Sequence, residues 1–125
     1  MTLEELLRAL PKVELHCHLY GSVRKETFSD LAVRRKAPLT QAQIDVLYTR
    51  KRKPWPTNDV LRMLDDHLIR EEDDLHRLVF EYLEDAGLDG VRHAEFFWNP
   101  TATVRSGHGQ RSAGATTWRA PTRST

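Results

Sequence analysis

The first twenty residues carry two hydrophobic patterns, one after the other. Leucines recur every three or four residues before Pro11, at Leu3, Leu6, Leu7 and Leu10. This spacing predicts a short amphipathic helix. Residues 13–19 (Val-Glu-Leu-His-Cys-His-Leu) alternate instead, so His16 and His18 are expected on one face of a strand. The apolar set is expected on the other face, against a layer of helices: Val13, Leu15, Cys17 and Leu19.

Helical spacing returns after a turn at residues 21–22. A helix is predicted over residues 25–36, with three apolar residues on its buried face: Phe28, Leu31 and Ala32. Thr40 and Gln43 have the spacing of a capping box and predict the start of a shorter helix. We therefore expect the first strand to be followed by helices rather than by a hairpin.

A second strand is expected after the longest helical segment. That segment is predicted over residues 57–86, with a break near residues 71–74 and with Gly87 as its C-terminal stop. Residues 91–98 begin with Val91 and end with three aromatic residues, a composition that predicts a strand. Two strands joined by this much helix are parallel, through a right-handed crossover. The chain is therefore expected to be an α/β protein.

Composition divides the chain in two. All 18 acidic residues lie at or before Glu95, whereas residues 101–125 hold four arginines, no acid and few large apolar side chains. Such a segment buries too little surface to order itself. We interpret residues 104–125 as a disordered, non-native tail, of the kind that a shifted reading frame or an early stop produces.

His16 and His18 are the strongest candidates for chemistry. Neutral imidazole is a common zinc ligand, and two imidazoles spaced by two residues on a strand converge on one ion without bending the backbone. Two hydrogen-bonded histidines on a buried strand would give the same pattern. The neighbouring residues decide between these interpretations.

Those neighbours resemble the opening of the adenosine deaminase family of metal-dependent hydrolases. The resemblance is specific over residues 12–27, from Lys-Val-Glu-Leu-His-Cys-His to Glu26-Thr27, and weaker matches lie at residues 90–95 and at Asn99-Pro100. It covers residues 1 to about 103, which we take as the family-like part. It implies a (β/α)8 barrel in which His16 and His18 bind zinc, and hydrolytic deamination of adenosine or a related purine.

Length limits what this resemblance can supply. A (β/α)8 barrel needs about 250 residues, and the chain has 125. The resemblance therefore implies an incomplete N-terminal part of a barrel, lacking the later zinc ligands and the glutamate that serves as acid and base. No catalytic residue can be assigned, and the chain alone is expected to be inactive.

Three residues at the end of the first strand are expected to contact the substrate: His18, Tyr20 and Gly21. The family commonly has Asp where Tyr20 stands, and there the carboxylate binds the ribose. Tyr20 can donate one hydrogen bond and stack, but it carries no charge at neutral pH. The identity of the purine or purine nucleoside is therefore left open. Gly21 fits either a close approach to the ligand or a simple turn.

Parts of the same sequence also fit other functions. His93-Ala94-Glu95 resembles the zinc signature of cytidine deaminases, but that site needs two more cysteines, and Cys17 is the single cysteine. A His-x-His metallophosphoesterase is the enzymatic alternative, although its usual flanking residues are absent here. A non-catalytic fragment of a deaminase is the third possibility.

The remaining expectations concern location and partners. No 18-residue apolar run and no signal-peptide pattern is present, so no membrane association is expected. Cys17 is expected in the core, and one cysteine fits a reducing, cytoplasmic location. The basic run at residues 50–53 is a solvated loop rather than a nucleic-acid site. Unpaired strand edges in a partial barrel predict self-association of the chain.

Overall fold

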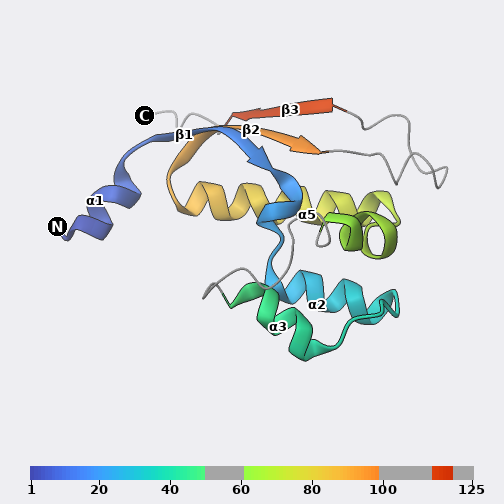
Figure 1. Cartoon of the computed structure of the whole chain (residues 1–125). Helices are drawn as coiled ribbons and strands as arrows, with labels where there is room; N and C mark the ends of the chain where they lie inside the picture. Colours follow the sequence, from blue (N-terminus) through green and yellow to red (C-terminus); the bar gives the residue numbers. More distant parts are fainter. Residues whose placement is uncertain (50–60, 99–113, 120–125) are drawn as a thin grey trace.

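The computed structural model describes residues 1–49, 61–98 and 114–119. These residues form a layered α/β structure, in which helix α5 lies along one face of a three-stranded sheet and a pair of helices, α2 and α3, lies beyond α5 (Figure 1). The strands are ordered β1-β2-β3, with the bounds Lys12–His18, Val91–Trp98 and Gly114–Arg119. None of the helices in the described ranges is long and apolar enough to cross a bilayer.

Both expected capping boxes are formed. Helix α1 (Leu3–Ala9) begins after Thr2, whose hydroxyl accepts a hydrogen bond from the Glu5 backbone N–H at 3.2 Å. Helix α3 (Gln41–Tyr48) begins in the same way after Thr40, which accepts from the Gln43 N–H at 3.3 Å. Each box satisfies N–H groups that the first helical turn leaves without partners. The sequence thus predicted both helix starts.

Helix α2 (Lys25–Arg34) belongs to the second helical layer, which α2 and α3 form beyond α5. It buries the three apolar residues expected from the sequence, and the core they join also contains Tyr20 and Val23, which follow β1, and Ile44 of α3. Leu64 and Leu68 complete this core and are fully buried. Burial of this kind is the main favourable contribution to folding, so the second layer fixes the turn that follows β1.

The longest helical segment is interrupted, as expected. Residues Leu64–Leu68 form a π-helical turn, closed by a hydrogen bond from the Ile69 N–H to the Leu64 carbonyl at 2.9 Å. Helix α5 (Glu72–Leu88) then begins, and the Asp74 carboxylate accepts hydrogen bonds from the backbone N–H groups of Arg70 and Glu71, both at 3.0 Å. The expected start of the segment and the basic run at residues 50–53 lie outside the described residues.

The expected stop at Gly87 is wrong. Helix α5 continues through Gly87 to Leu88, and the left-handed residue is Gly90, with φ of 83°. A Cβ at Gly90 would lie 2.5 Å from the carbonyl oxygen of Arg8. Glycine is required there because it tolerates positive φ and lets the two backbones approach closely. Gly87 has open space around it, so glycine is not needed at that position.

The two strands expected from the sequence are parallel neighbours. His18 pairs with Phe97 and Cys17 with Phe96, and the register shifts twice, between residues 12 and 13 and between residues 14 and 17. The first strand ends one residue earlier than predicted, because Leu19 opens a 3₁₀ turn over Leu19–Ser22. This turn directs Leu19 and Tyr20 into the core, where both are buried.

The structure differs from the expectation for part of the C-terminal tail. Gly114–Arg119 forms β3, antiparallel to β2, with Ala94 paired to Trp118 and Trp98 paired to Gly114. A strand edge offers backbone donors and acceptors to any segment that reaches it. Low apolar content therefore did not prevent pairing here. The interpretation of residues 104–125 as a non-native tail stays a prediction.

One face of the sheet is covered and the other is open. Leu19, Ala94 and Phe96 are buried against Tyr82 of α5, and Cys17 packs at the edge of this cluster. Val13 and Leu15 were expected against helices, but they are 60% and 59% exposed. Within the part of the chain that the structure describes, α5 covers β2 and the end of β1 and leaves the start of β1 bare (Figure 1).

Candidate functional site

The two histidines of β1 lie together, as the alternation predicted. The ring centroids of His16 and His18 are 5.1 Å apart, and that of His16 is 4.6 Å from the centroid of Phe97 on β2. Phe96, the neighbour of Phe97, packs on Tyr82 on the α5 side. Because side chains alternate, Phe97 and both histidines lie on the open face. All three are exposed.

This arrangement fits two ligands of one zinc ion. Imidazole nitrogens bind zinc at about 2.0–2.1 Å, and a tetrahedral angle between two of them places the ring centroids about 5 Å apart. The observed separation is 5.1 Å. Among residues 1–49, 61–98 and 114–119, no group of three or more His, Cys, Asp or Glu residues could hold a metal. The separation of the two rings is compatible with one shared zinc ion, and a metal-binding role for His16 and His18 stays a prediction.

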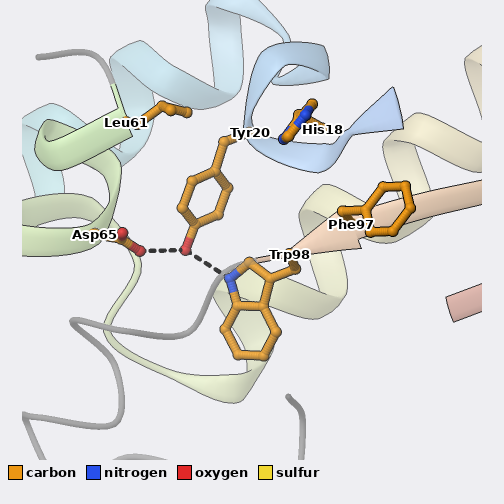
Figure 2. A pocket seen from close by; sticks show the side chains of 6 residues that line it. All are labelled: His18, Tyr20, Leu61, Asp65, Phe97 and Trp98. Atoms are coloured by element: carbon orange, nitrogen blue, oxygen red, sulfur yellow. Dashed lines mark hydrogen bonds between the residues drawn. The ribbon is translucent and has the colours of Figure 1, made fainter. Parts of the chain in front are cut away.

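A pocket of about 100 Å³ lies beside this pair. Figure 2 shows its lining residues, which come from three separate parts of the chain: His18, Tyr20, Leu61, Asp65, Phe97 and Trp98. Three of the six side chains are aromatic rings other than imidazole. Aromatic walls with a few polar groups are typical of sites for planar ligands. His18 belongs both to the histidine pair and to the pocket wall.

Tyr20 is held by two hydrogen bonds inside this wall. Its hydroxyl donates to Asp65 Oδ1 at 2.9 Å and accepts from the Trp98 indole N–H at 2.7 Å (Figure 2). The side chain is only 8% exposed. The expectation that Tyr20 lines the substrate site is compatible with this position. The hydroxyl proton of Tyr20, however, is donated to Asp65.

Asp65 is one of four lining residues that sequence reasoning missed, together with Leu61, Phe97 and Trp98. It lies 45 positions from Tyr20, on the π-helical turn, and no motif surrounds it. A carboxylate in an acidic helical segment is ordinarily solvated, so the sequence carried no signal for its role. The contact appears only when the second layer of helices is assembled.

Gly21 faces open space. It lies in the 3₁₀ turn after β1, and a Cβ built there would meet no atom within 4 Å. The fold of the described residues therefore does not require glycine at this position. A contact between Gly21 and a substrate stays a prediction.

The other candidate residues have ordinary partners. His93 Nε2 lies 3.0 Å from Glu95 Oε1 on β2. Burial raises the pKa of the Cys17 thiol, against a weaker opposing effect of the nearby Tyr82 hydroxyl. Since the thiolate is the form that binds metals, Cys17 acts as a core residue. His67 and His76 are exposed.

Comparison with known proteins agrees with this geometry. The family model described as adenosine deaminase matches residues 11–116, and so continues past residue 103, where the motifs quoted above end. A zinc-bound amidohydrolase from B. ambifaria is 54% identical and superimposes with a TM-score of 0.79. The superposition covers 87% of this chain and 31% of the amidohydrolase. The first two strands and their helices thus follow the start of an amidohydrolase barrel.

Curated relatives bear two different substrate names. An adenine deaminase from Pseudomonas entomophila is 36% identical over 101 residues, which are 77% of this chain and 31% of the relative. An adenosine deaminase from Clostridium kluyveri is 27% identical over 112 residues, which are 86% of this chain and 32% of the relative. The chain spans about a third of the length of these relatives. The family match covers most of the sequence, and the chain belongs to the adenosine deaminase family.

Proposed function

We propose that this sequence forms the zinc-binding and purine-binding start of a barrel that deaminates an aminopurine by hydrolysis. The single observation that carries the proposal is the pairing of His16 and His18 on the open face, directly beside an aromatic pocket that His18 helps to line. The relatives named adenine and adenosine deaminases support the reaction class. The zinc-bound relative supports the metal.

Each residue has a role in this proposal. His16 and His18 would hold zinc, which when bound lowers the pKa of a water molecule to near 7. The rings of Tyr20, Phe97 and Trp98 would enclose a planar purine. Gly21 would let the substrate approach the backbone closely. His18 would fix the distance between the metal and the purine, because it belongs to both sites.

The pocket favours this function over phosphoester hydrolysis. Its described lining contains a carboxylate, Asp65, and neither lysine nor arginine. Phosphate groups are recognised by cationic side chains and backbone N–H groups. A site that meets its ligand with a carboxylate and three aromatic rings suits a neutral ring better than a phosphate.

The 125-residue chain on its own is proposed to be inactive. Catalytic zinc sites ordinarily use three protein ligands, and the described residues provide two. We expect zinc to bind this chain more weakly than micromolar. Calorimetric titration that shows submicromolar affinity, lost on His16→Ala, would contradict this. A cytoplasmic location is part of the proposal, supported by the single, reduced Cys17.

The test of activity uses a complete barrel. Residues 1–98 of this chain are joined to the part of the B. ambifaria amidohydrolase that follows its matching segment, and the product is called the hybrid. The similarity of the two backbones makes the junction reasonable. We expect the hybrid to release ammonia from adenine or adenosine, and no phosphate from phosphoesters. Phosphate release without ammonia would support the metallophosphoesterase alternative instead.

A further inference from the structure

We propose that Phe97 is a positioning residue for the metal site, because its ring contacts both imidazoles of β1 and limits their rotation. The consequence is tighter binding of zinc by His16 and His18. This inference rests on the proposed function and deepens it, because it names the side chain that holds the two metal ligands in the orientation they need.

The need for such a residue follows from the histidine side chain. Rotation about the bond between Cβ and the imidazole ring has a broad energy profile, so rotamer preference alone does not fix the plane of the ring. Two imidazoles bind one ion only when a nitrogen of each ring points to the same position. In metal sites, this orientation is usually fixed by a hydrogen bond at the second ring nitrogen. A closely packed aromatic ring restricts the same rotation by steric contact.

Three rings contact one another on the open face of the sheet. The ring centroid of Phe97 lies 4.6 Å from that of His16 and 6.2 Å from that of His18, and the two imidazole centroids are 5.1 Å apart. The Phe97 ring is tilted by 43° to the first imidazole and by 39° to the second. Attractive aromatic pairs have centroid separations of about 4.5–7 Å. Phe97 therefore contacts each imidazole at a favourable distance.

The sheet itself fixes the position of Phe97. Phe97 pairs with His18 in the parallel register of β1 and β2, and Figure 2 shows the two side chains on the same side of the pocket. The preceding residue, Phe96, is 4% exposed and packs on Tyr82. Because side chains alternate along a strand, burial of Phe96 on one face directs Phe97 to the other. Phe97 is thus held in place by the core, independently of the metal.

The test measures the zinc affinity of the hybrid by competition with a chelating indicator, and it does not depend on deamination. Phe97→Leu removes the aromatic ring and keeps an apolar side chain. We expect it to bind zinc about tenfold more weakly, at the lower end of the effect of removing groups that orient metal ligands. Phe97→Tyr keeps the ring and should retain the affinity. Phe80→Leu is the matched control, because Phe80 is an exposed phenylalanine on α5, and it should also retain the affinity.

A second measurement separates positioning from a structural role. Urea denaturation of the metal-free hybrids should give nearly the same midpoint for Phe97→Leu and the unmodified protein, since Phe97 is 37% exposed. Phe97→Met, which also lacks a ring, replaces Phe97→Leu in both measurements if the leucine variant does not fold. A loss of stability that accounts for the loss of affinity would indicate a structural role and contradict the inference.

The zinc titrations give two further results that would overturn the inference. One is zinc binding by Phe97→Leu as tight as that of the unmodified hybrid. The other is an equal loss of affinity in Phe97→Tyr and Phe97→Leu, since the tyrosine variant keeps the ring. If His16→Ala does not weaken zinc binding by the hybrid, the proposed metal site is wrong, and this inference with it.

Discussion

The two faces of the sheet differ in what they contribute. On the α5 side, Ala94 and Phe96 are buried and pack against Tyr82. On the open side, His16, His18 and Phe97 are in ring contact but exposed. Adjacent residues on one strand, Phe96 and Phe97, therefore lie in the core and beside the histidine pair respectively. The covered face holds the strands in register, and the register places the histidines of one strand beside the pocket residues of the next.

The largest expected effect comes from removing the open-face histidines. In the hybrid, His16→Ala or His18→Ala should remove most of the bound zinc and lower deamination by about a thousandfold or more, because the metal activates the attacking water. Zinc content by atomic absorption and the rate of ammonia release are the two measurements. His76→Ala, on the exposed surface of α5, is the control and should change neither. Full zinc occupancy in the His16 variant would contradict the assignment.

Phe96 and Phe97 give a direct comparison of the two faces. Phe96 is 4% exposed and its ring centroid lies 5.3 Å from that of Tyr82, whereas Phe97 is 37% exposed. Phe96→Ala should lower the free energy of unfolding by about 3–5 kcal/mol through lost burial and a cavity. Phe97→Ala should cost about 1 kcal/mol or less and should weaken substrate binding. Urea denaturation of the two hybrids tests this. Equal losses of stability would show that the open face is also part of the core.

Asp74 tests how α5 is held against the second layer. The cost of burial on this carboxylate is outweighed by hydrogen bonds from the Arg70 N–H, the Arg35 guanidinium and the Glu71 N–H, which together lower its pKa. A lowered folded-state pKa gives stability that is present above the unfolded-state pKa and is lost as pH falls through the folded value. Asp74→Asn should therefore cost about 1–3 kcal/mol at pH 7 and flatten the loss of stability below about pH 4. An unchanged acid profile would contradict this role.

The smallest effect concerns the bare part of β1. The described residues leave Leu15 exposed at 59%, and an exposed apolar strand favours association with other chains. We expect the 125-residue chain to self-associate and Leu15→Lys to reduce this, because charge on a strand opposes pairing. Sedimentation velocity measures the change. Val46→Lys, at an exposed apolar position on α3, is the control. A monomeric 125-residue chain would show that the bare strand is tolerated.

Local patterns in the sequence predicted the local parts of the structure. The capping boxes at Thr2 and Thr40, the alternation around His16 and His18, and the parallel strand at residues 91–98 each depend on near neighbours, and each is observed. Gly90, rather than Gly87, takes the left-handed conformation, and the carbonyl oxygen of Arg8 lies close to it. This contact joins residues about eighty positions apart and leaves no local pattern.

Contacts between residues far apart in the sequence account for the parts of the structure that local patterns did not predict. Strand β3 forms on an edge that β2 provides, which no periodicity within residues 104–125 could indicate. Asp65 reaches Tyr20 only because the π-helical turn and the second helical layer place it there. The pairing of His16 with His18 could therefore be predicted from the sequence, whereas the contact between Asp65 and Tyr20 could not.

Anomalous diffraction from crystals of the hybrid at the zinc absorption edge is the most direct test of the central claim, that the open face of β1 is a metal site. The account predicts an anomalous peak at about 2.0–2.1 Å from one ring nitrogen of both His16 and His18, on the side of the sheet away from α5. A hybrid that releases ammonia while its zinc lies elsewhere, with both imidazoles hydrogen-bonded to protein groups, would contradict the account.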